Sequence, residues 1–259
     1  ANNTDRTTWI LSRIILQGLF RNRYLNPERL PATGPVILAA NHASYFDPPL
    51  IGSGLARPVN YLARDTLFKY PIFRGMLREL HCVPVDRDGA GAAGLKGIFD
   101  RLSGGGVILL FPEGTRTPDG SLRPARAGIG LTVIKSKAPV LPVRVFGTFD
   151  AYSRHARFPT LHPIAVKYGR PLYFEAERAE VAHAPKARVK EIYQEVANRL
   201  MAEIAALSRA RTSTSSPPPP GSSSRRGPRT PPGPMERRRG VQALGPQHLL
   251  HGRGRLGHR

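Results

Sequence analysis

The sequence predicts a single α/β domain in which helices flank a mostly parallel central sheet. Short apolar runs bounded by turn residues are typical of buried strands, and residues 107–111 form the most strand-like of them. These runs alternate with longer segments of helical periodicity, which is the pattern of a parallel sheet with crossover helices. The chain of 259 residues, 40% of them apolar, is long enough to bury the core of one domain.

The expected elements follow one another along residues 31–210, which form the predicted folded domain. Strands are predicted at residues 35–40, 59–63, 82–85, 107–111, 139–145 and 164–168, and helices at 48–56, 92–102, from 128 onward and at 186–208. The last helix has apolar residues at helical spacing, including Ile192, Val196 and Leu200, so one of its faces is expected to pack on the core. Residues 64–78 interleave large apolar side chains with cations, which suits either amphipathic packing or a surface facing a membrane or an acyl chain.

The two ends of the chain differ from this domain. Within residues 1–30 we expect an amphipathic helix over 8–23, with Trp9 and Phe20 among its apolar side chains and Arg21 and Arg23 at its end. It either packs on the domain or lies in a membrane interface, with Trp9 and the arginines at headgroup level. Residues 211–259 are rich in Pro, Ser and Arg and have no apolar period, so we predict a disordered tail.

The charge favours anionic partners. The chain carries a net charge of +21, and residues 211–259 contribute ten arginines and one acidic residue to it. Phosphates, anionic lipid surfaces and nucleic acids would all suit such a surplus. Nucleic-acid binding predicts aromatic side chains interleaved with basic ones, and the tail has none, so no specific nucleic-acid partner is expected.

Several other classes of protein are disfavoured. The only cysteine is Cys82, which excludes an intramolecular disulfide, and its apolar neighbours favour a buried, inert thiol. No His/Cys spacing predicts a metal site, and no Gly-rich phosphate loop or nucleophile elbow is present. No run of about 20 apolar residues predicts a helix that spans a membrane.

His42 and Asp47 are the first candidates for chemistry. His42 follows the predicted strand at 35–40, at the carboxyl end where open α/β sheets place their ligand crevices. Asp47 precedes Pro48 and is expected to be the N-cap of a helix. Across a strand–turn–helix its carboxylate can also reach one imidazole nitrogen of His42, leaving the other to accept a proton from a hydroxyl. Each residue taken alone also suits a plain cap or a solvated loop histidine.

A second polar stretch follows the strand predicted at 107–111. Glu113, Gly114, Thr115 and Arg116 supply a carboxylate, a flexible joint, a hydroxyl and a guanidinium. The guanidinium fork of Arg116 suits bidentate binding of a phosphate. Arg87 lies just after the strand predicted at 82–85, where it could be a solvated turn residue or part of the same site.

In this order the stretches resemble the glycerolipid acyltransferase family, whose best-known member acts on 1-acylglycerol-3-phosphate. The first and third family motifs are intact, and the second and fourth are weaker. They correspond to Asn41, His42 and Asp47; to Val85, Asp86 and Arg87; to residues 111–116; and to residues 139–143. After the third motif this chain has Pro124-Ala125-Arg126, which keeps a charge but lacks the aromatic residue common in the family.

The resemblance implies an enzyme that moves a fatty acyl group from acyl-CoA or acyl carrier protein to the hydroxyl of 1-acylglycerol-3-phosphate, giving phosphatidic acid in phospholipid biosynthesis. By that analogy His42 is the general base and Asp47 orients it, while Arg87 and Arg116 hold the phosphate. The pocket would be shaped by Glu113, Gly114 and Thr115. The implied enzyme needs no cofactor or metal, and it is peripheral or monotopic on the cytoplasmic face of the cell membrane, in contact with anionic lipid.

Two alternatives stay open from the sequence. The same chemistry could act on another lysophospholipid or on glycerol 3-phosphate. A non-catalytic protein that binds anionic lipid would also carry a basic surface, but binding a phosphate requires neither His42 nor Asp47.

Overall fold

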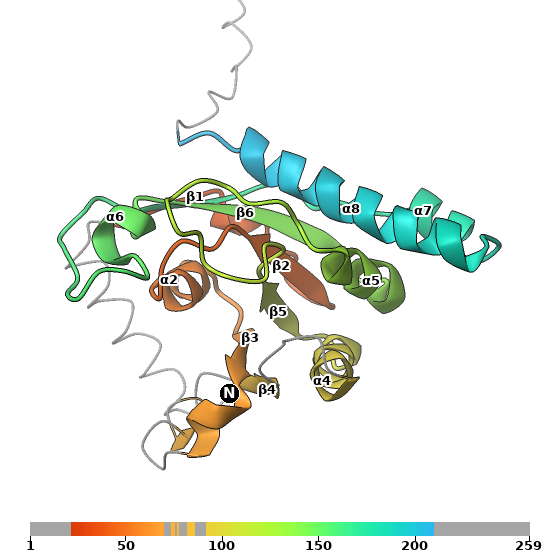
Figure 1. The fold of residues 1–259 in the computed structure, drawn as a ribbon, viewed down its shortest axis with the longest axis horizontal. Coiled ribbons are helices and arrows are strands. Elements are labelled where there is room, and N and C mark those ends of the chain that lie inside the picture. The colour runs from red at the N-terminus through yellow and green to blue at the C-terminus, as the bar shows by residue number, and fades with distance from the viewer. Residues whose placement is uncertain (1–21, 70–73, 76, 78–81, 86–91, 210–259) are drawn as a thin grey trace, which may run out of the picture. The chain divides into compact units, whose positions relative to one another are not determined.

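The computed structural model describes residues 22–69, 74–75, 77, 82–85 and 92–209. The predicted α/β class is confirmed, because seven strands form one sheet in the order β1-β7-β6-β2-β5-β3-β4 (Figure 1). All neighbouring strands pair in parallel except β6 and β7, which are antiparallel. The strands are β1 Arg23–Leu25, β2 Val36–Ala40, β3 Val59–Arg64, β4 Cys82–Val85, β5 Val107–Leu110, β6 Val140–Phe146 and β7 Ala165–Tyr168.

The helices cover both faces of the sheet. They are α2 Asp47–Ser53, α4 Ala92–Ser103, α5 Ala127–Ser136, α6 Thr148–Tyr152, α7 Glu175–Val181 and α8 Lys186–Ala206, with two 3₁₀ turns, η1 Pro27–Arg29 and η2 Asp65–Lys69. In the parts of the chain that the structure describes, none of these helices has the length and apolar character needed to cross a bilayer.

Alternation along β2 explains why its sequence is apolar throughout. The side chains of Ile37 and Ala39 belong to one core cluster, together with residues of α4, α5 and α8. The side chains of Val36, Leu38 and Ala40 belong to a second cluster, with residues of α2 and α6 on the opposite face (Figure 1). A parallel strand buried on both faces needs apolar residues at every position.

The predicted packing of the last helix is confirmed. Ile192, Val196, Leu200 and Ile204 are at most 1% exposed and belong to the cluster under α5 and α8. The two helices come very close at Gly130, where an added Cβ would lie 1.9 Å from the carbonyl oxygen of Tyr193. This close contact therefore requires a glycine in α5.

Strand β1 and helices α6 and α7 were not predicted, and each has a physical reason. Strand β1 has only three residues at the sheet edge, where Arg23, expected to close a helix, instead pairs with Ala165. Helices α6 and α7 have five and seven residues, too few to establish an apolar period. The rest of the predicted helix at 8–23 and the tail at 211–259 lie outside the described residues, so they stay predictions.

The two central strands β2 and β5 lead the chain to opposite faces of the sheet. Strand β2 is followed by α2 on one face of the sheet, and the neighbouring β5 is followed by α5 on the other. Loops that leave adjacent strands toward opposite faces separate at the carboxyl ends of these strands, where ligands of open α/β folds bind. The turn after β2 contains His42, and the loop after β5 contains Glu113 and Arg116.

Candidate active site

His42 and Asp47 form a close pair at the carboxyl end of β2. The Nδ1 atom of His42 lies 2.8 Å from Oδ2 of Asp47, so the predicted contact between the two side chains is confirmed. The carboxylate is fully buried, whereas 17% of the His42 side chain is exposed. Because a carboxylate accepts at Nδ1, the proton sits on that nitrogen and Nε2 carries a lone pair.

The predicted N-cap role of Asp47 is wrong. Asp47 is the first residue of α2, Phe46 occupies the N-cap, and Pro48 stands in the first turn as expected. Oδ2 of Asp47 instead accepts hydrogen bonds from the backbone N–H groups of Ala43 (2.6 Å) and Ser44 (2.7 Å). The carboxylate therefore turns back toward the His42 turn, where these two donors and the imidazole N–H stabilise its negative charge.

The rest of His42 is fixed by the loop after β5. Its backbone N–H donates to Oε1 of Glu113 at 3.0 Å, and its carbonyl oxygen accepts from the N–H of Thr117 at 2.8 Å. The imidazole stacks on the ring of Phe111, with centroids 3.8 Å apart and planes inclined by 13°. Backbone and ring contacts thus leave the imidazole little freedom to rotate away from Asp47.

Glu113 lies behind the His42 turn. It is 2% exposed, and its second carboxylate oxygen accepts from the backbone N–H of Arg123 at 3.3 Å. Burial raises the pKa of this carboxyl, and the two backbone N–H bonds and the charge of Arg123 partly offset that rise. The sequence placed Glu113 in the acceptor pocket; the structure shows it joining the two loops that build the site.

Gly114 and Thr115 follow in a tight turn. Gly114 has φ +70°, a backbone conformation that favours glycine, and an added Cβ would lie 2.9 Å from the side chain of Arg126. Its N–H donates to the carbonyl oxygen of Phe111 at 3.0 Å, which closes the turn. Thr115 is partly exposed between Gly114 and Arg116.

Arg116 returns to the His42 turn through an aromatic contact. Its guanidinium carbon lies 3.4 Å from the ring centroid of Tyr45, a cation–π geometry. The Nη1 atom is buried and has no hydrogen-bond partner in the described part of the chain. A buried donor without a partner costs about 1–3 kcal/mol, so Nη1 is a polar atom that the described part of the chain does not satisfy.

The structure thus brings six of the seven predicted site residues together at the carboxyl ends of β2 and β5, with Thr115 in the turn between Gly114 and Arg116. His42 and Asp47 form the pair, Glu113 supports it, and Gly114 shapes the turn that carries Arg116. Arg87 lies outside the described residues, so its place in the site stays a prediction.

Sequence reasoning gave no role to two residues that support the pair. The side chain of Asn41 extends the pairing of β2 with β6, because Oδ1 accepts from the N–H of Val145 (2.8 Å) and Nδ2 donates to its carbonyl oxygen (3.3 Å). The hydroxyl of Ser44 donates to the carbonyl oxygen of Tyr152 at 2.7 Å. The position of Asn41 in the first motif was the available signal. Ser44 is fully buried.

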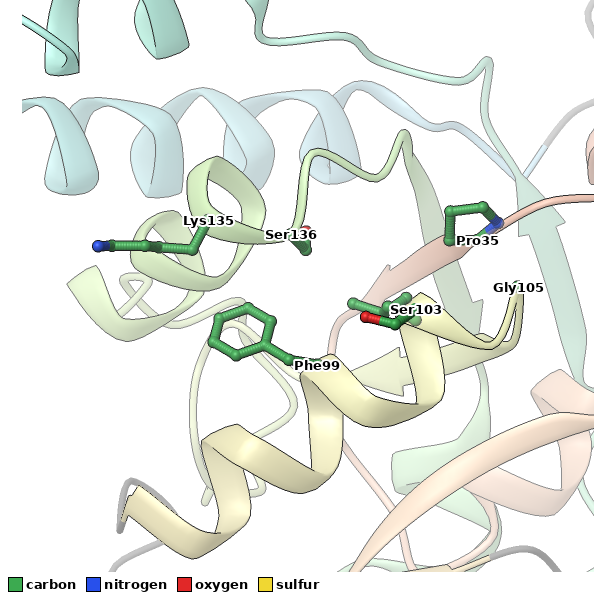
Figure 2. A pocket seen from close by; sticks show the side chains of 7 residues that line it. Pro35, Phe99, Ser103, Gly105, Lys135 and Ser136 are labelled. Atoms are coloured by element: carbon green, nitrogen blue, oxygen red, sulfur yellow. The ribbon is translucent and has the colours of Figure 1, made fainter.

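A separate cavity of about 300 Å³ lies at the amino ends of the central strands, and Figure 2 shows the residues that line it. It is lined by Phe99 and Ser103 of α4, Lys135 of α5, and by Pro35 and Gly105, which precede β2 and β5. It therefore sits at the amino ends of strands whose carboxyl ends carry His42 and Glu113. In the described ranges, no group of three or more His, Cys, Asp or Glu side chains is placed to hold a metal.

The α/β fold and the motifs at the carboxyl ends of β2 and β5 are those expected of the glycerolipid acyltransferase family. Residues 21–146 match the family model described as Acyltransferase, so this part of the chain belongs to that family of enzymes.

The similar proteins include several with the same printed activity. The 1-acyl-sn-glycerol-3-phosphate acyltransferase of Bacillus subtilis is 27% identical over 180 residues, which cover 69% of this chain and 85% of that protein. The lyso-ornithine lipid O-acyltransferase of Pseudomonas aeruginosa is 30% identical over 113 residues, or 43% of each chain. For the chloroplastic 1-acyl-sn-glycerol-3-phosphate acyltransferase of Brassica napus, the match covers only 36% of its length.

A solved structure supports the fold. The crystal structure of the 1-acyl-sn-glycerophosphate acyltransferase PlsC from Thermotoga maritima aligns with a TM-score of 0.61 and 24% identity, covering 80% of this chain and 81% of that one.

Proposed function

We propose that the protein transfers a fatty acyl group from a thioester donor to the free hydroxyl of 1-acylglycerol-3-phosphate, giving phosphatidic acid for phospholipid biosynthesis. The observation that carries this proposal is the 2.8 Å contact between Nδ1 of His42 and Asp47, which leaves Nε2 as a base at the carboxyl end of β2. The printed activity of the Bacillus subtilis relative supports the acceptor.

In the first step Nε2 of His42 takes the proton of the acceptor hydroxyl while the hydroxyl oxygen bonds to the thioester carbon. A tetrahedral intermediate forms, with the negative charge on the former carbonyl oxygen. Asp47 stabilises the positive charge that develops on the imidazole, because its oxygen already accepts from Nδ1.

In the second step the tetrahedral intermediate collapses and its carbon–sulfur bond breaks. The thiolate takes the proton from Nε2 of His42, so free thiol and acylated acceptor leave together and His42 returns to its starting state. A covalent acyl-enzyme is unnecessary because the thioester is already activated. The fully buried hydroxyl of Ser44 is hydrogen-bonded to backbone, which agrees with this scheme. Either acyl-CoA or acyl carrier protein can supply the thioester, and no further cofactor is required.

Arg116 binds the phosphate of the acceptor in this scheme and fixes the hydroxyl near His42. Its guanidinium is held against Tyr45 and keeps an unsatisfied donor, Nη1. Gly114 and Thr115 shape the turn beside it, and Arg87 is a second phosphate ligand by family resemblance. Holding the acceptor in one geometry lowers the entropic barrier to attack.

The enzyme works as a peripheral or monotopic protein at the cytoplasmic face of the cell membrane, where its lipid acceptor resides. The net charge of +21 supports contact with anionic lipid, and the amphipathic segment at residues 8–23 is a candidate for interfacial binding.

Thiol release from an acyl thioester tests the proposal directly. Purified protein is assayed with and without 1-acylglycerol-3-phosphate, beside His42→Ala, whose fold is checked by circular dichroism. We expect release that requires both the acceptor and His42, with His42→Ala slower by about 10² to 10⁴-fold. Retained activity in His42→Ala would refute the mechanism.

The acceptor is tested with a panel of other lyso-lipids and glycerol 3-phosphate. The similarity to a lyso-ornithine lipid O-acyltransferase makes another lyso-lipid the second candidate acceptor. Activity with a different panel member would change the proposed acceptor and leave the proposed acyl-transfer reaction unchanged. No thiol release with any member would favour the non-catalytic lipid-binding protein.

A further inference from the structure

The loop between α6 and β7, residues 153–164, exposes two large apolar side chains. Phe158 is 73% exposed and Leu161 is 76% exposed, higher fractions than those of the other exposed large apolar residues in the described part of the chain. Two such side chains three residues apart on one surface loop suggest a binding surface. We call residues 153–164 the 153–164 loop.

Hydrogen bonds hold this loop in place. The N–H of Thr160 donates to the carbonyl oxygen of Ala151 at 2.8 Å. The hydroxyl of Thr160 donates to the backbone carbonyl oxygen of Asp150 at 2.7 Å. At the far end, Nη2 of Arg209 donates to the carbonyl oxygen of Pro163 at 3.2 Å. Thr160 lies between Phe158 and Leu161, and Pro163 follows them, so these contacts fix the part of the loop that presents the two side chains.

The charges around the apolar pair are positive. Arg154 and Arg157 are exposed, and residues 153–164 contain two histidines and no Asp or Glu. The Arg157 guanidinium lies 5.9 Å from the ring centroid of Phe158. The adjacent carboxylate of Asp150 lies 3.6 Å from Nε2 of His162, on the α6 side of the loop. Apolar side chains beside exposed arginines are typical of segments that enter the interface of an anionic bilayer.

The loop is connected to the His42 turn through α6. The carbonyl oxygen of Tyr152, the last residue of α6, accepts the hydroxyl of Ser44 at 2.7 Å. The ring of Tyr152 also lies 5.0 Å from that of Phe46 and 5.6 Å from that of Tyr45. Figure 1 shows α6 beside α2, and the loop after α6 extends outward from the sheet. The loop that carries Phe158 and Leu161 therefore follows directly after α6, and α6 contacts the His42 turn.

We propose that the 153–164 loop is a membrane contact that inserts Phe158 and Leu161 into an anionic bilayer, with Arg154 and Arg157 at the headgroups. The loop would bring the edge of the sheet that carries His42 to the surface from which a lipid acceptor arrives. That consequence rests on the proposed function, whereas the bilayer contact can be measured without it. An acidic carrier protein would also attract the arginines, but it would not require two exposed apolar side chains.

Vesicle binding of the full chain tests the apolar pair. Phe158→Ser with Leu161→Ser is compared with Tyr173→Ser, which removes another exposed aromatic residue (59%) outside the loop. Sedimentation with vesicles of phosphatidylglycerol and phosphatidylcholine should show affinity lowered about tenfold or more for the loop variant and unchanged for the control. Equal binding by the loop variant and the wild type would overturn the proposal.

A charge-matched pair of variants tests the arginines. Arg154→Gln with Arg157→Gln removes two charges from the loop, and Lys186→Gln with Lys190→Gln removes two exposed charges from α8. The loop variant should bind anionic vesicles more weakly than the α8 variant at low salt, and added salt should narrow the difference. Equal losses in the two variants would show that only net charge matters and would overturn the headgroup role.

Insertion can be measured at the side chain itself. The chain has a single tryptophan, Trp9, so Phe158→Trp in a Trp9→Phe background places one fluorophore in the loop. Anionic vesicles should shift its emission to shorter wavelength, and brominated lipids should quench it. Unshifted and unquenched emission with protein bound to the vesicles would place the contact elsewhere.

Activity measurements separate failure of this inference from failure of the proposed function. With a short-chain acceptor present as monomers in solution, the Phe158 and Leu161 double variant should release thiol as fast as the wild type. With the acceptor embedded in vesicles, its rate should fall in parallel with its binding. A raised KM for acyl carrier protein without loss of vesicle binding would assign the loop to the donor. If the wild type releases no thiol, the proposed function fails, and the vesicle measurements still decide whether the loop binds a bilayer.

Discussion

Two buried carboxylates control one histidine from opposite directions. Asp47 accepts from the imidazole of His42, and Glu113 accepts from its backbone N–H. Asp47 comes from the helix after β2 and Glu113 from the loop after β5, so the position of His42 depends on two neighbouring strands. Glu113 is therefore a positioning residue, whereas His42 contacts the reacting atoms in the proposed mechanism.

Replacing Glu113 tests this positioning role. In Glu113→Gln the side chain keeps one acceptor oxygen for two backbone donors, and its new NH₂ group faces the other N–H. We expect kcat to fall about tenfold or more while the KM for both substrates changes little, because the base is displaced and the binding residues are not. Glu113→Asp should restore less than half of the lost activity, since it keeps the charge but is one methylene shorter. A raised acceptor KM with unchanged kcat would instead make Glu113 a substrate ligand.

The same residue predicts a pH dependence of stability. Burial raises the pKa of Glu113 in the folded chain above its ordinary value of 4.5, so the folded state holds this proton more tightly than the unfolded state. Its contribution to the free energy of unfolding is therefore fully present below that value and is lost as the pH rises through the raised pKa. Urea denaturation of the wild type and of Glu113→Gln from pH 4 to 7 measures this contribution. As the pH rises, the free energy of unfolding of the wild type should fall relative to that of the variant. A constant difference would contradict the raised pKa.

Arg116 should affect binding of the acceptor more than the chemical step. Removing the guanidinium in Arg116→Ala deletes the proposed phosphate ligand, and we expect the acceptor KM to rise at least about tenfold, with the donor KM unchanged. Tyr45→Ala leaves the guanidinium but removes the ring against it, so a smaller rise is expected. Steady-state kinetics with each substrate varied separately gives both constants. An unchanged acceptor KM in Arg116→Ala would remove this residue from the pocket.

At the scale of elements, the local pattern of apolar residues identified most of the strands and helices. In the strand β2 every residue is apolar, and in the helix α8 the apolar residues recur at helical spacing. Both elements are buried along these apolar positions. The edge strand β1 pairs with β7, about 140 residues away in the sequence, and no local pattern reports such a partner.

The same distinction separates the predictable part of the site from the rest. The contact between His42 and Asp47 could be predicted because the two residues are five positions apart and one turn connects them. The bond from His42 to Glu113 spans 71 residues, and the stacking of Arg116 on Tyr45 depends on where two loops meet. Those contacts follow from the order of strands in the sheet, which local sequence does not encode.

The contact between α5 and α8 provides a stability prediction with an internal control. A methyl group at Gly130 would lie 1.9 Å from the carbonyl oxygen of Tyr193, so Gly130→Ala must push the helices apart. We expect a loss of about 1–3 kcal/mol in the free energy of unfolding. Gly128→Ala in the same helix meets nothing within 4 Å and should stabilise by up to about 1 kcal/mol. Urea denaturation of both variants checks the contrast, and equal effects would contradict the close packing.

For the molecule as a whole, a part of the basic surplus lies outside the part of the chain that carries the described site. The described residues of the site lie between Asn41 and Tyr152, whereas residues 214–259 carry nine arginines and one acidic residue, which is +8 of the net charge of +21. The arginines of residues 214–259 can thus raise affinity for anionic surfaces without taking part in the reaction. Charge and chemistry should therefore be separable by truncation.

Ending the chain at Ser213 tests this separation. The truncated protein keeps α8 and Arg209, whose guanidinium donates to the carbonyl oxygen of Pro163, so the 153–164 loop retains its support. We expect unchanged kcat and KM with a soluble short-chain acceptor, because the described site residues are all present. Binding to anionic vesicles should weaken and depend less on salt, since fewer arginines displace counterions at the surface. If thiol release with the soluble acceptor falls together with vesicle binding, residues 214–259 take part in the reaction or in folding of the domain, and the separation of charge from chemistry is wrong.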